Sequence, residues 1–285
     1  QIGAGQSHAM PHMYRDGNLS VAAWDFRPDF ADAAGSAWSS IHDMSLWAQF
    51  LLRGGVTGGG DRLISEQGIK EMFEPHQLAS ENDFYPTTKL TQPNWRSYGL
   101  AWFQQDFQGR KIDFHTGSLS GLIAIIGLDR ANGKAVIVLG NRDHAEMRHA
   151  LLWEVMDNSV GEDRRDWNAE IFEMYETARK ESDEKWSEAE QKRLVDTKPA
   201  LPLGDYAGIY RNETMGDIRI EESGGELTLR TTRVDFEMMH WHLETFLVQY
   251  PAWGMREFGA FNIGSDGVVG SLSLFGNEFV VVGDE

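Results

Sequence analysis

The sequence predicts a mixed α+β or α/β protein, in which an antiparallel sheet with packed helices precedes a small all-β antiparallel barrel. Two patterns support this prediction. Apolar residues at helix and strand spacing alternate through residues 41–157, and about eight short apolar runs with glycine-bearing turns fill residues 203–285. Short strands at a spacing of roughly ten residues are typical of a barrel or a sandwich. We therefore divide the chain into a first domain, a connector and a barrel, with bounds 1–160, 161–198 and 199–285.

Two helices are predicted in the first domain ahead of its strands. Residues 41–52 place apolar side chains at helical spacing, and Ser39 or Ser40 can cap this helix at its N-terminus. A second helix is predicted over residues 65–73. The remaining stretches are polar or only weakly periodic, so we expect loops over residues 1–30 and 77–96.

Strands then follow in quick succession. Strand-like runs cover residues 98–106, 111–115, 121–129 and 134–141. The last two runs are nearly all apolar, which predicts a sheet that is covered on both faces. A helix is predicted over residues 144–157.

The connector differs in composition from both domains. Residues 162–196 hold twelve acidic and seven basic residues with only scattered apolar ones, which favours a solvated helical connector. Pro199 and Pro202 mark its end.

The composition excludes several classes of function. The chain has 26 basic and 44 acidic residues, and its net charge of −18 repels phosphate backbones, so we expect no nucleic-acid partner. The absence of cysteine rules out disulfides, thiol catalysis and cysteine-ligated metals. The longest apolar run, Leu122–Leu128, is far shorter than a membrane span, and residues 1–20 do not resemble a signal peptide.

The segment from His115 to Gly121 is the strongest candidate for chemistry. It is a polar, glycine-flanked stretch between two predicted strands, where backbone N–H groups can face a cleft. A histidine at a strand end can exchange protons near neutral pH. The alternative is an ordinary hairpin turn with a surface histidine. Leu119 occupies the central place of Gly117–Gly121, so this is not the nucleophile elbow of an α/β-hydrolase.

Two other histidine pairs were considered as metal ligands. His144 and His149 are five residues apart, so they do not share a helix face. His240 and His242 share one face of a predicted strand, but no third ligand is evident. We interpret both pairs as structural and expect no metal.

The residues around His115 resemble those of a known family. His115-Thr116-Gly117, ahead of two apolar strands that end at Gly140-Asn141, is similar to the third active-site motif of serine β-lactamase-like hydrolases. This group includes class C β-lactamases, related esterases, D-aminopeptidases and penicillin-binding-protein-like enzymes. The resemblance extends to the segment from Ala34-Gly35-Ser36 to Gly54-Gly55 and to Tyr98–Trp102, and covers about residues 1–157. The last domain is similar to the lipocalin-like barrel often appended to these enzymes, through Tyr206–Tyr210 and His240-Trp241.

The family's first two motifs do not occur in their expected place. They are Ser-x-x-Lys, which holds the nucleophile, and then Tyr-x-Asn or Ser-x-Asn. The Ser-x-x-Lys of this chain, Ser182–Lys185, lies after His115 in the connector, and its Tyr-x-Asn, Tyr210–Asn212, lies in the barrel. Ser80–Asn82 precedes His115 but sits in a polar loop. We therefore expect the nucleophile, its lysine and the tyrosine to be missing from this chain.

The resemblance implies roles for the third motif. His115 would stand where lysine is commoner, tuning proton transfer or holding a substrate carboxylate. Thr116 would hydrogen-bond the substrate, and Gly117 would let the strand approach it closely. The backbone N–H of Ser118 would be the second oxyanion donor. A histidine in place of lysine fits esterase and peptidase relatives at least as well as β-lactamases.

The sequence thus predicts the C-terminal portion of a serine hydrolase that acts through an acyl-enzyme on a small-molecule or peptide ester or amide. Neither metal nor organic cofactor is needed for that chemistry. A start at Gln1 suggests a processed or truncated chain, inactive alone, which self-associates or stays bound to a companion fragment. The family favours a periplasmic or secreted location. The alternative is a non-catalytic protein that uses the barrel to bind a ligand or a partner.

Overall fold

The computed structural model divides the chain into two compact units. The first comprises Gln1–Trp24 and Ala33–Glu181, and the second comprises Asp25–Asp32 and Ser182–Glu285. The residues that the structure describes are 7–15, 18–22, 32–35, 37–80, 84–119, 121–232, 234–251 and 254–283. Several positions used in the patterns above lie outside these ranges, namely Ser36, Glu81, Asn82 and Ser120.

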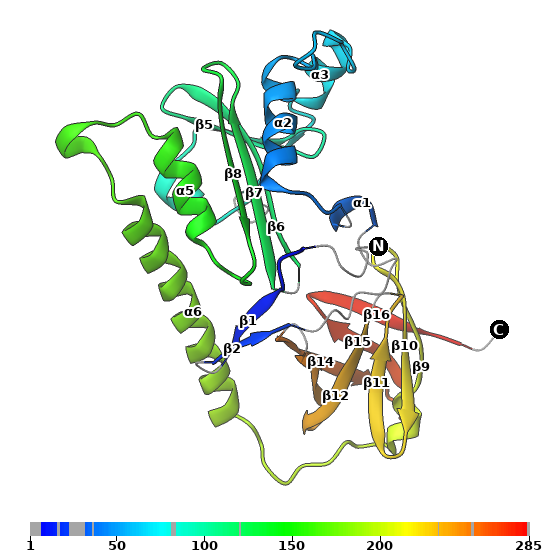
Figure 1. Ribbon diagram of the computed structural model, residues 1–285. Helices are drawn as coiled ribbons and strands as arrows, with labels where there is room; N and C mark the ends of the chain where they lie inside the picture. Colours follow the sequence, from blue (N-terminus) through cyan, green and yellow to red (C-terminus); the bar gives the residue numbers. More distant parts are fainter. Residues whose placement is uncertain are drawn as a thin grey trace. The chain divides into compact units, whose positions relative to one another are not determined.

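An antiparallel sheet is the framework of the first unit (Figure 1). Because its strand order follows chain order, each strand pairs with its neighbour in sequence. Among the described residues, this sheet consists of β3 (Gln77–Leu78), β4 (Arg96–Tyr98), β5 (Phe103–Phe107), β6 (Arg110–Leu119), β7 (Leu122–Asp129) and β8 (Lys134–Gly140).

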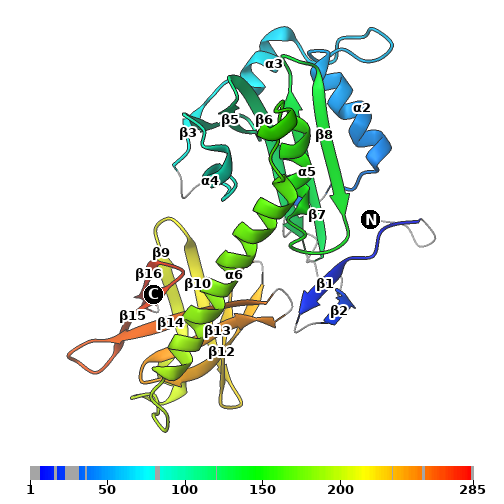
Figure 2. The same cartoon turned by 90° about the vertical axis from the view of Figure 1, so that its left-hand side faces the viewer.

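Helices cover both faces of this sheet, with α2 and α5 on opposite sides (Figures 1 and 2). On one face, α2 (Ile41–Leu52) and α3 (Glu66–Met72) pack against β7 and β8, and their shared core includes Leu51 and Leu128. On the other face, α5 (Met147–Met156) and the start of α6 (Trp167–Gln191) pack over β6 and β7. Coverage on two sides explains the apolar runs of β7 and β8. The short helices in this unit's connections are α4 (Thr88–Thr91) and η1 (Gly161–Asp163); α1 (Asp32–Gly35) lies near the start of the chain.

The predicted helix starts are confirmed by their caps. The Ser40 side chain accepts a hydrogen bond from the backbone N–H of Asp43 at 3.1 Å. Ser65 accepts one from Gly68 at 3.0 Å. Each serine thereby satisfies a backbone donor that has no partner within its own helix.

The loop prediction for residues 1–30 is wrong in part, because a hairpin forms there. Strand β1 (His12–Arg15) pairs with β2 (Asn18–Val21), and the N–H of His12 donates to the Gly121 carbonyl at 3.2 Å. The expected loop over 77–96 likewise contains β3 and α4. The hairpin is anchored to Gly121 and β3 pairs with β4, and these contacts are not evident from local periodicity.

Two predicted strands have different bounds. The run over 98–106 breaks into β4 and β5 at a turn in which Ala101 has a φ of 64°. The strand predicted to end at His115 continues to Leu119, which pairs with Leu122 across the turn. The residues from Thr116 to Leu119 therefore lie within β6, and the prediction that this stretch lies between two strands is wrong for them.

The second unit holds the predicted barrel, which is closed because β9 pairs with both β10 and β16. It begins after η2 (Leu203–Tyr206). Its strands are β9 (Gly208–Asn212), β10 (Gly216–Ser223), β11 (Glu226–Arg230), β12 (Asp235–His242), β13 (Thr245–Tyr250), β14 (Met255–Ile263), β15 (Val269–Leu274) and β16 (Asn277–Val282).

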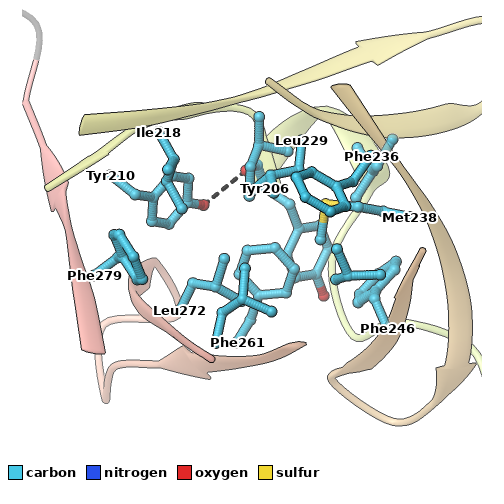
Figure 3. Close-up of a cluster of buried hydrophobic side chains, with 14 of the residues drawn as sticks. Tyr206, Tyr210, Ile218, Leu229, Phe236, Met238, Phe246, Phe261, Leu272 and Phe279 are labelled. Carbon is cyan, nitrogen blue, oxygen red and sulfur yellow. Dashed lines mark hydrogen bonds between the residues drawn. The ribbon is translucent and has the colours of Figure 1, made fainter. Parts of the chain in front are cut away.

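The barrel interior is filled by side chains (Figure 3). Inward-facing residues alternate along each strand, as for Ile218 and Ile220 on β10. The Tyr210 hydroxyl, at this core, donates to the Tyr206 carbonyl at 2.7 Å, and the Tyr206 hydroxyl is bonded to Glu244. The buried phenols are thus satisfied by hydrogen bonds inside the barrel.

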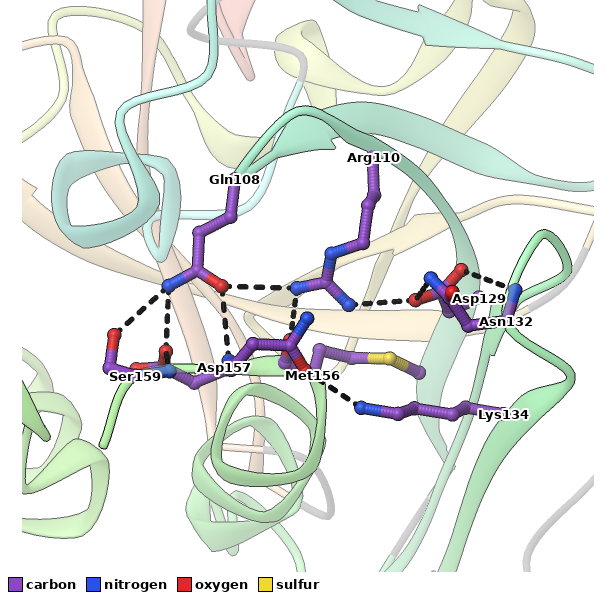
Figure 4. Close-up of polar contacts among 9 residues, drawn as sticks. Gln108, Arg110, Asp129, Asn132, Lys134, Met156, Asp157 and Ser159 are labelled. Carbon is purple, nitrogen blue, oxygen red and sulfur yellow. Dashed lines mark hydrogen bonds and ion pairs between the residues drawn. The ribbon is translucent and has the colours of Figure 1, made fainter.

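A polar network links the β5–β6 turn and the end of β7 to the C-terminal end of α5 (Figure 4). Arg110 donates to Asp129 at 2.7 Å and to the Met156 carbonyl. Gln108 donates to Asp157 at 2.7 Å. Although partial burial opposes it, hydrogen bonds from Ser159, Trp167 and Gln108 lower the pKa of Asp157 to about 2. These bonds hold α5 in register on β6 and β7.

Replacing Gly99 with alanine is expected to destabilise the first unit by about 1–3 kcal/mol. A Cβ at this buried position would lie 2.8 Å from the Met72 carbonyl oxygen, so the backbone would have to shift. Gly117→Ala is the matched control, because a Cβ there meets no atom within 4 Å. Urea denaturation followed by tryptophan fluorescence compares the two, and equal midpoints would contradict the packing argument.

Candidate active site

The segment that carries the candidate residues is the part of β6 that extends past β5. The first residue of β5, Phe103, pairs with Phe114. Beyond that pair, the described residues of the sheet pair with β6 only through β7, so one edge of the strand is open. The Tyr85 hydroxyl donates to the Thr116 carbonyl at 3.2 Å, which places the backbone groups of Thr116 on that edge. Alternate residues of a strand direct their backbone groups to the same side, so the N–H of Ser118 points there too.

His115 is half-buried beside two aromatic rings. Its Nε2 lies 3.2 Å from the Tyr98 hydroxyl, and its ring is 5.4 Å from that of Phe103. Burial lowers the pKa of His115 below 6.5 and raises that of Tyr98 above 10.0. At neutral pH the imidazole is therefore uncharged and the phenol keeps its proton, so the pair can hold or pass one proton.

Thr116 and Gly117 lie on opposite faces of β6. Thr116 is buried, and its hydroxyl donates to the Ala124 carbonyl of β7 at 2.8 Å. Gly117 is exposed on the face that His115 shares, and a Cβ there would meet no atom within 4 Å. The strand is thus accessible over Gly117, whereas Thr116 contributes to the pairing of β6 with β7.

Ser118 is contacted from behind by α5. Its hydroxyl accepts a hydrogen bond from Arg148 at 3.0 Å, and Arg148 lies 3.5 Å from the Glu146 carboxylate. Arg148 is only 5% exposed, so its charge is balanced by Glu146 within the fold. His149 is fully buried beside this pair, with its ring 5.2 Å from that of Tyr85.

The structure therefore brings together His115, Gly117 and the N–H of Ser118, and adds residues that the sequence did not single out as site residues. Tyr98 contacts His115, Tyr85 contacts Thr116 and Arg148 contacts Ser118. Tyr98 lies on β4, Tyr85 lies in the loop before α4, and Arg148 lies on α5. Nothing in their spacing could have revealed the contacts, which depend on strand register for Tyr98 and on loop and helix packing for Tyr85 and Arg148.

The other sequence motifs have separate surroundings. Ser182 and Lys185 are exposed on α6, and the Tyr210 hydroxyl is used inside the barrel. His240 contacts the Leu243 carbonyl at 2.8 Å, while His242 accepts the Leu194 N–H at 3.1 Å. Within the described ranges, no three His, Asp or Glu side chains gather as metal ligands. None of the helices described there is long and apolar enough to cross a membrane.

Comparison with known families assigns the first unit. The model of the Beta-lactamase family matches residues 3–160, more than half of the chain. The chain therefore belongs to this family of β-lactamase-like hydrolases. A second family model, described as a domain of unknown function (DUF3471), matches residues 192–283 and so covers the barrel.

Individual relatives are more distant. The chain is 28% identical over 187 residues to Unguisins hydrolase ungD' of Aspergillus campestris (strain IBT 28561), a match that covers 62% of this chain and 32% of that protein. The chain thus spans about a third of that relative. Among solved structures, it is similar to SurE, at 16% identity and a TM-score of 0.41 over 99% of this chain and 58% of that one. It is also similar to the octameric penicillin-binding protein homologue from Pyrococcus abyssi, at 16% identity and a TM-score of 0.38, over 95% and 52% of the two chains.

The buried His149 predicts a loss of stability in acid. Burial, aided by Arg148, lowers its pKa from 6.5 to about 4, so the folded protein holds this imidazole neutral. As pH falls from 6.5 towards 4, the unfolded chain binds a proton that the folded chain does not. This group should therefore cost about 2 kcal/mol of stability between about pH 7 and about pH 4.5.

The measurement is chemical denaturation of the wild type and His149→Phe at both pH values. Phenylalanine keeps a ring in contact with Tyr85 but cannot titrate. The variant should lose less stability than the wild type on acidification, and an identical loss in both proteins would show that His149 does not titrate as expected.

Proposed function

We propose that this chain contributes one wall of the active site of a serine hydrolase, which acts through an acyl-enzyme on an ester or amide. The observation that carries the proposal is the open edge of β6, where His115, Gly117 and the N–H of Ser118 lie together in a member of the Beta-lactamase family. The name of the curated relative, a hydrolase, is consistent with this class.

Each residue of this edge has a distinct task in the proposal. The Ser118 N–H donates a hydrogen bond to the oxyanion that develops on the attacked carbonyl. The neutral His115, paired with Tyr98, accepts or relays a proton near the nucleophile. Gly117 leaves room for the substrate to lie against the strand. Because the Thr116 hydroxyl is bonded to Ala124, we assign Thr116 to holding the strand rather than the substrate.

The nucleophile is the part of the proposal that this sequence does not supply. The Ser-x-x-Lys of this chain follows His115 and lies on α6, and the tyrosine of its Tyr-x-Asn is buried in the barrel. We propose that the serine, lysine and tyrosine of the whole protein come from a segment outside this sequence.

Exposed apolar side chains in the first unit support the proposal that a further segment covers them. Ile41 on α2 is 55% exposed and Leu139 on β8 is 40% exposed. Burying such residues is favourable by roughly 25 cal/mol per Å² of apolar surface. In the proposal, the missing segment of the whole protein or a second copy of the chain covers this surface.

The purified chain is expected to show no hydrolase turnover, because oxyanion donors without a nucleophile cannot form an acyl-enzyme. The measurement uses p-nitrophenyl acetate, nitrocefin and a D-amino-acid amide as substrates. A burst of product, or turnover that a serine-directed phosphonate abolishes, would refute the missing nucleophile.

In the whole enzyme, His115→Ala is expected to lower kcat/KM by about ten- to a thousandfold, since it removes a proton-relay group. Ser118→Ala keeps the backbone N–H and should be mild, whereas Ser118→Pro removes that N–H and should be severe. Steady-state kinetics of the three variants give the comparison. Near-normal values for His115→Ala, or equal losses for the two Ser118 variants, would move the site elsewhere.

The same kinetics separate the enzyme from the alternative, a non-catalytic binding protein. If the whole protein, with its complete reading frame expressed, turns over none of these substrates and does not react with the phosphonate, the binding function is favoured.

A further inference from the structure

A cavity of about 430 Å³ opens at one mouth of the barrel, entirely within the second unit. Its volume is in the range of small-ligand sites. Its wall includes Trp186, Phe236, Val248, Met255, Arg256 and Phe275. The cavity lies at the strand ends where β12 and β14 begin and β13 and β15 finish.

The apolar part of this cavity is firmly held. Phe236 and Val248 belong to the barrel core and are 6% and 1% exposed. The ring of Phe275 lies 5.9 Å from that of Phe236 at the rim. Trp186, from α6, packs against Phe258 with ring centroids 4.8 Å apart. The buried Phe236 and Val248 thus form the floor of the cavity, and Trp186 and Phe275 contribute aromatic rings to its wall.

Phe275 adopts a backbone conformation that its side chain disfavours. Its φ is 52° and that of Gly276 is 71°, so the two form a hairpin turn with both central residues in the left-handed region. Asparagine or glycine is the usual choice for the first position, because a bulky side chain is strained there. A strained residue with a 37% exposed ring at the rim of a cavity indicates a role other than stability.

One cation at the cavity lacks a counter-ion. The Arg256 guanidinium lies 4.0 Å from the centre of the Trp186 ring, and no carboxylate or carbonyl of the described residues bonds to it. The neighbouring Glu257 uses its carboxylate to accept the N–H of Phe258 at 2.9 Å. Ser182, one helical turn before Trp186, adds a hydroxyl to the wall.

We propose that this cavity binds a small organic monocarboxylate with an aromatic or branched apolar tail. The tail lies among Trp186, Phe236 and Phe275, and the carboxylate pairs with Arg256, whose planar guanidinium suits two parallel hydrogen bonds. Glu257 and the net charge of −18 disfavour a dianion such as a phosphate monoester. This inference does not depend on the proposed hydrolase function.

Three probes of matched shape test the charge of the ligand: hydrocinnamate, its neutral amide and phenylpropylamine. Ligand-observed NMR titration of the purified chain should give the tightest binding for the carboxylate. Arg256→Gln should weaken hydrocinnamate binding at least about tenfold. Arg256→Lys should weaken it less, because lysine keeps the positive charge but cannot donate two parallel hydrogen bonds from a planar group. The matched control is Arg219→Gln, which removes another exposed barrel arginine outside the cavity.

Phe275→Asn separates binding from folding. Asparagine tolerates the left-handed conformation, so the variant should melt at a higher temperature than the wild type and yet bind hydrocinnamate more weakly. Absence of hydrocinnamate binding, tighter binding of the amine, or equal affinity in Arg256→Gln and Arg219→Gln would overturn the proposal. A gain in melting temperature with unchanged affinity in Phe275→Asn would also count against it.

Discussion

The first unit depends on the unequal lengths of two neighbouring strands. Strand β6 continues five residues past its last pair with β5, because Phe114 pairs with the first residue of β5 and Leu119 still pairs with β7. An unpaired strand edge presents backbone donors and acceptors, and most proteins cover it. Here the open edge carries His115 and the N–H of Ser118 instead. The same extension leaves Gly117 facing free space.

The two faces of this extension have different electrostatics. On one face, His115 and Tyr98 are partly desolvated and uncharged, which suits groups that exchange a proton. On the other, Arg148 and Glu146 form a buried ion pair that contacts the Ser118 hydroxyl. Such a pair is costly to break, because removing one partner leaves an uncompensated charge. It therefore restrains the strand from behind while the opposite face stays accessible.

In the second unit, the described strands of the barrel have no unpaired edge, because their sheet closes on itself. Pairing of β9 with β16 closes the sheet, and buried side chains fill the barrel core. The cavity of about 430 Å³ lies at the rim of the barrel, where this core packing ends. The residues at this rim include Arg256, which forms no ion pair with the described residues, and Phe275, which lies in a left-handed turn.

The sequence by itself determined the elements whose burial is periodic and whose ends carry caps. The helix after Ser40, the apolar strands β7 and β8, the charged helix and the barrel strands follow from local pattern, and the His115-Thr116-Gly117 motif pointed to β6. Tertiary structure decided the rest. The hairpin at His12, the turn at Ala101 and the extension of β6 past β5 lack a clear periodic pattern, and strand pairing fixes them. The contacts of Tyr98 with His115 and of Arg148 with Ser118 join residues 17 and 30 positions apart, and strand register and helix packing alone bring such residues together.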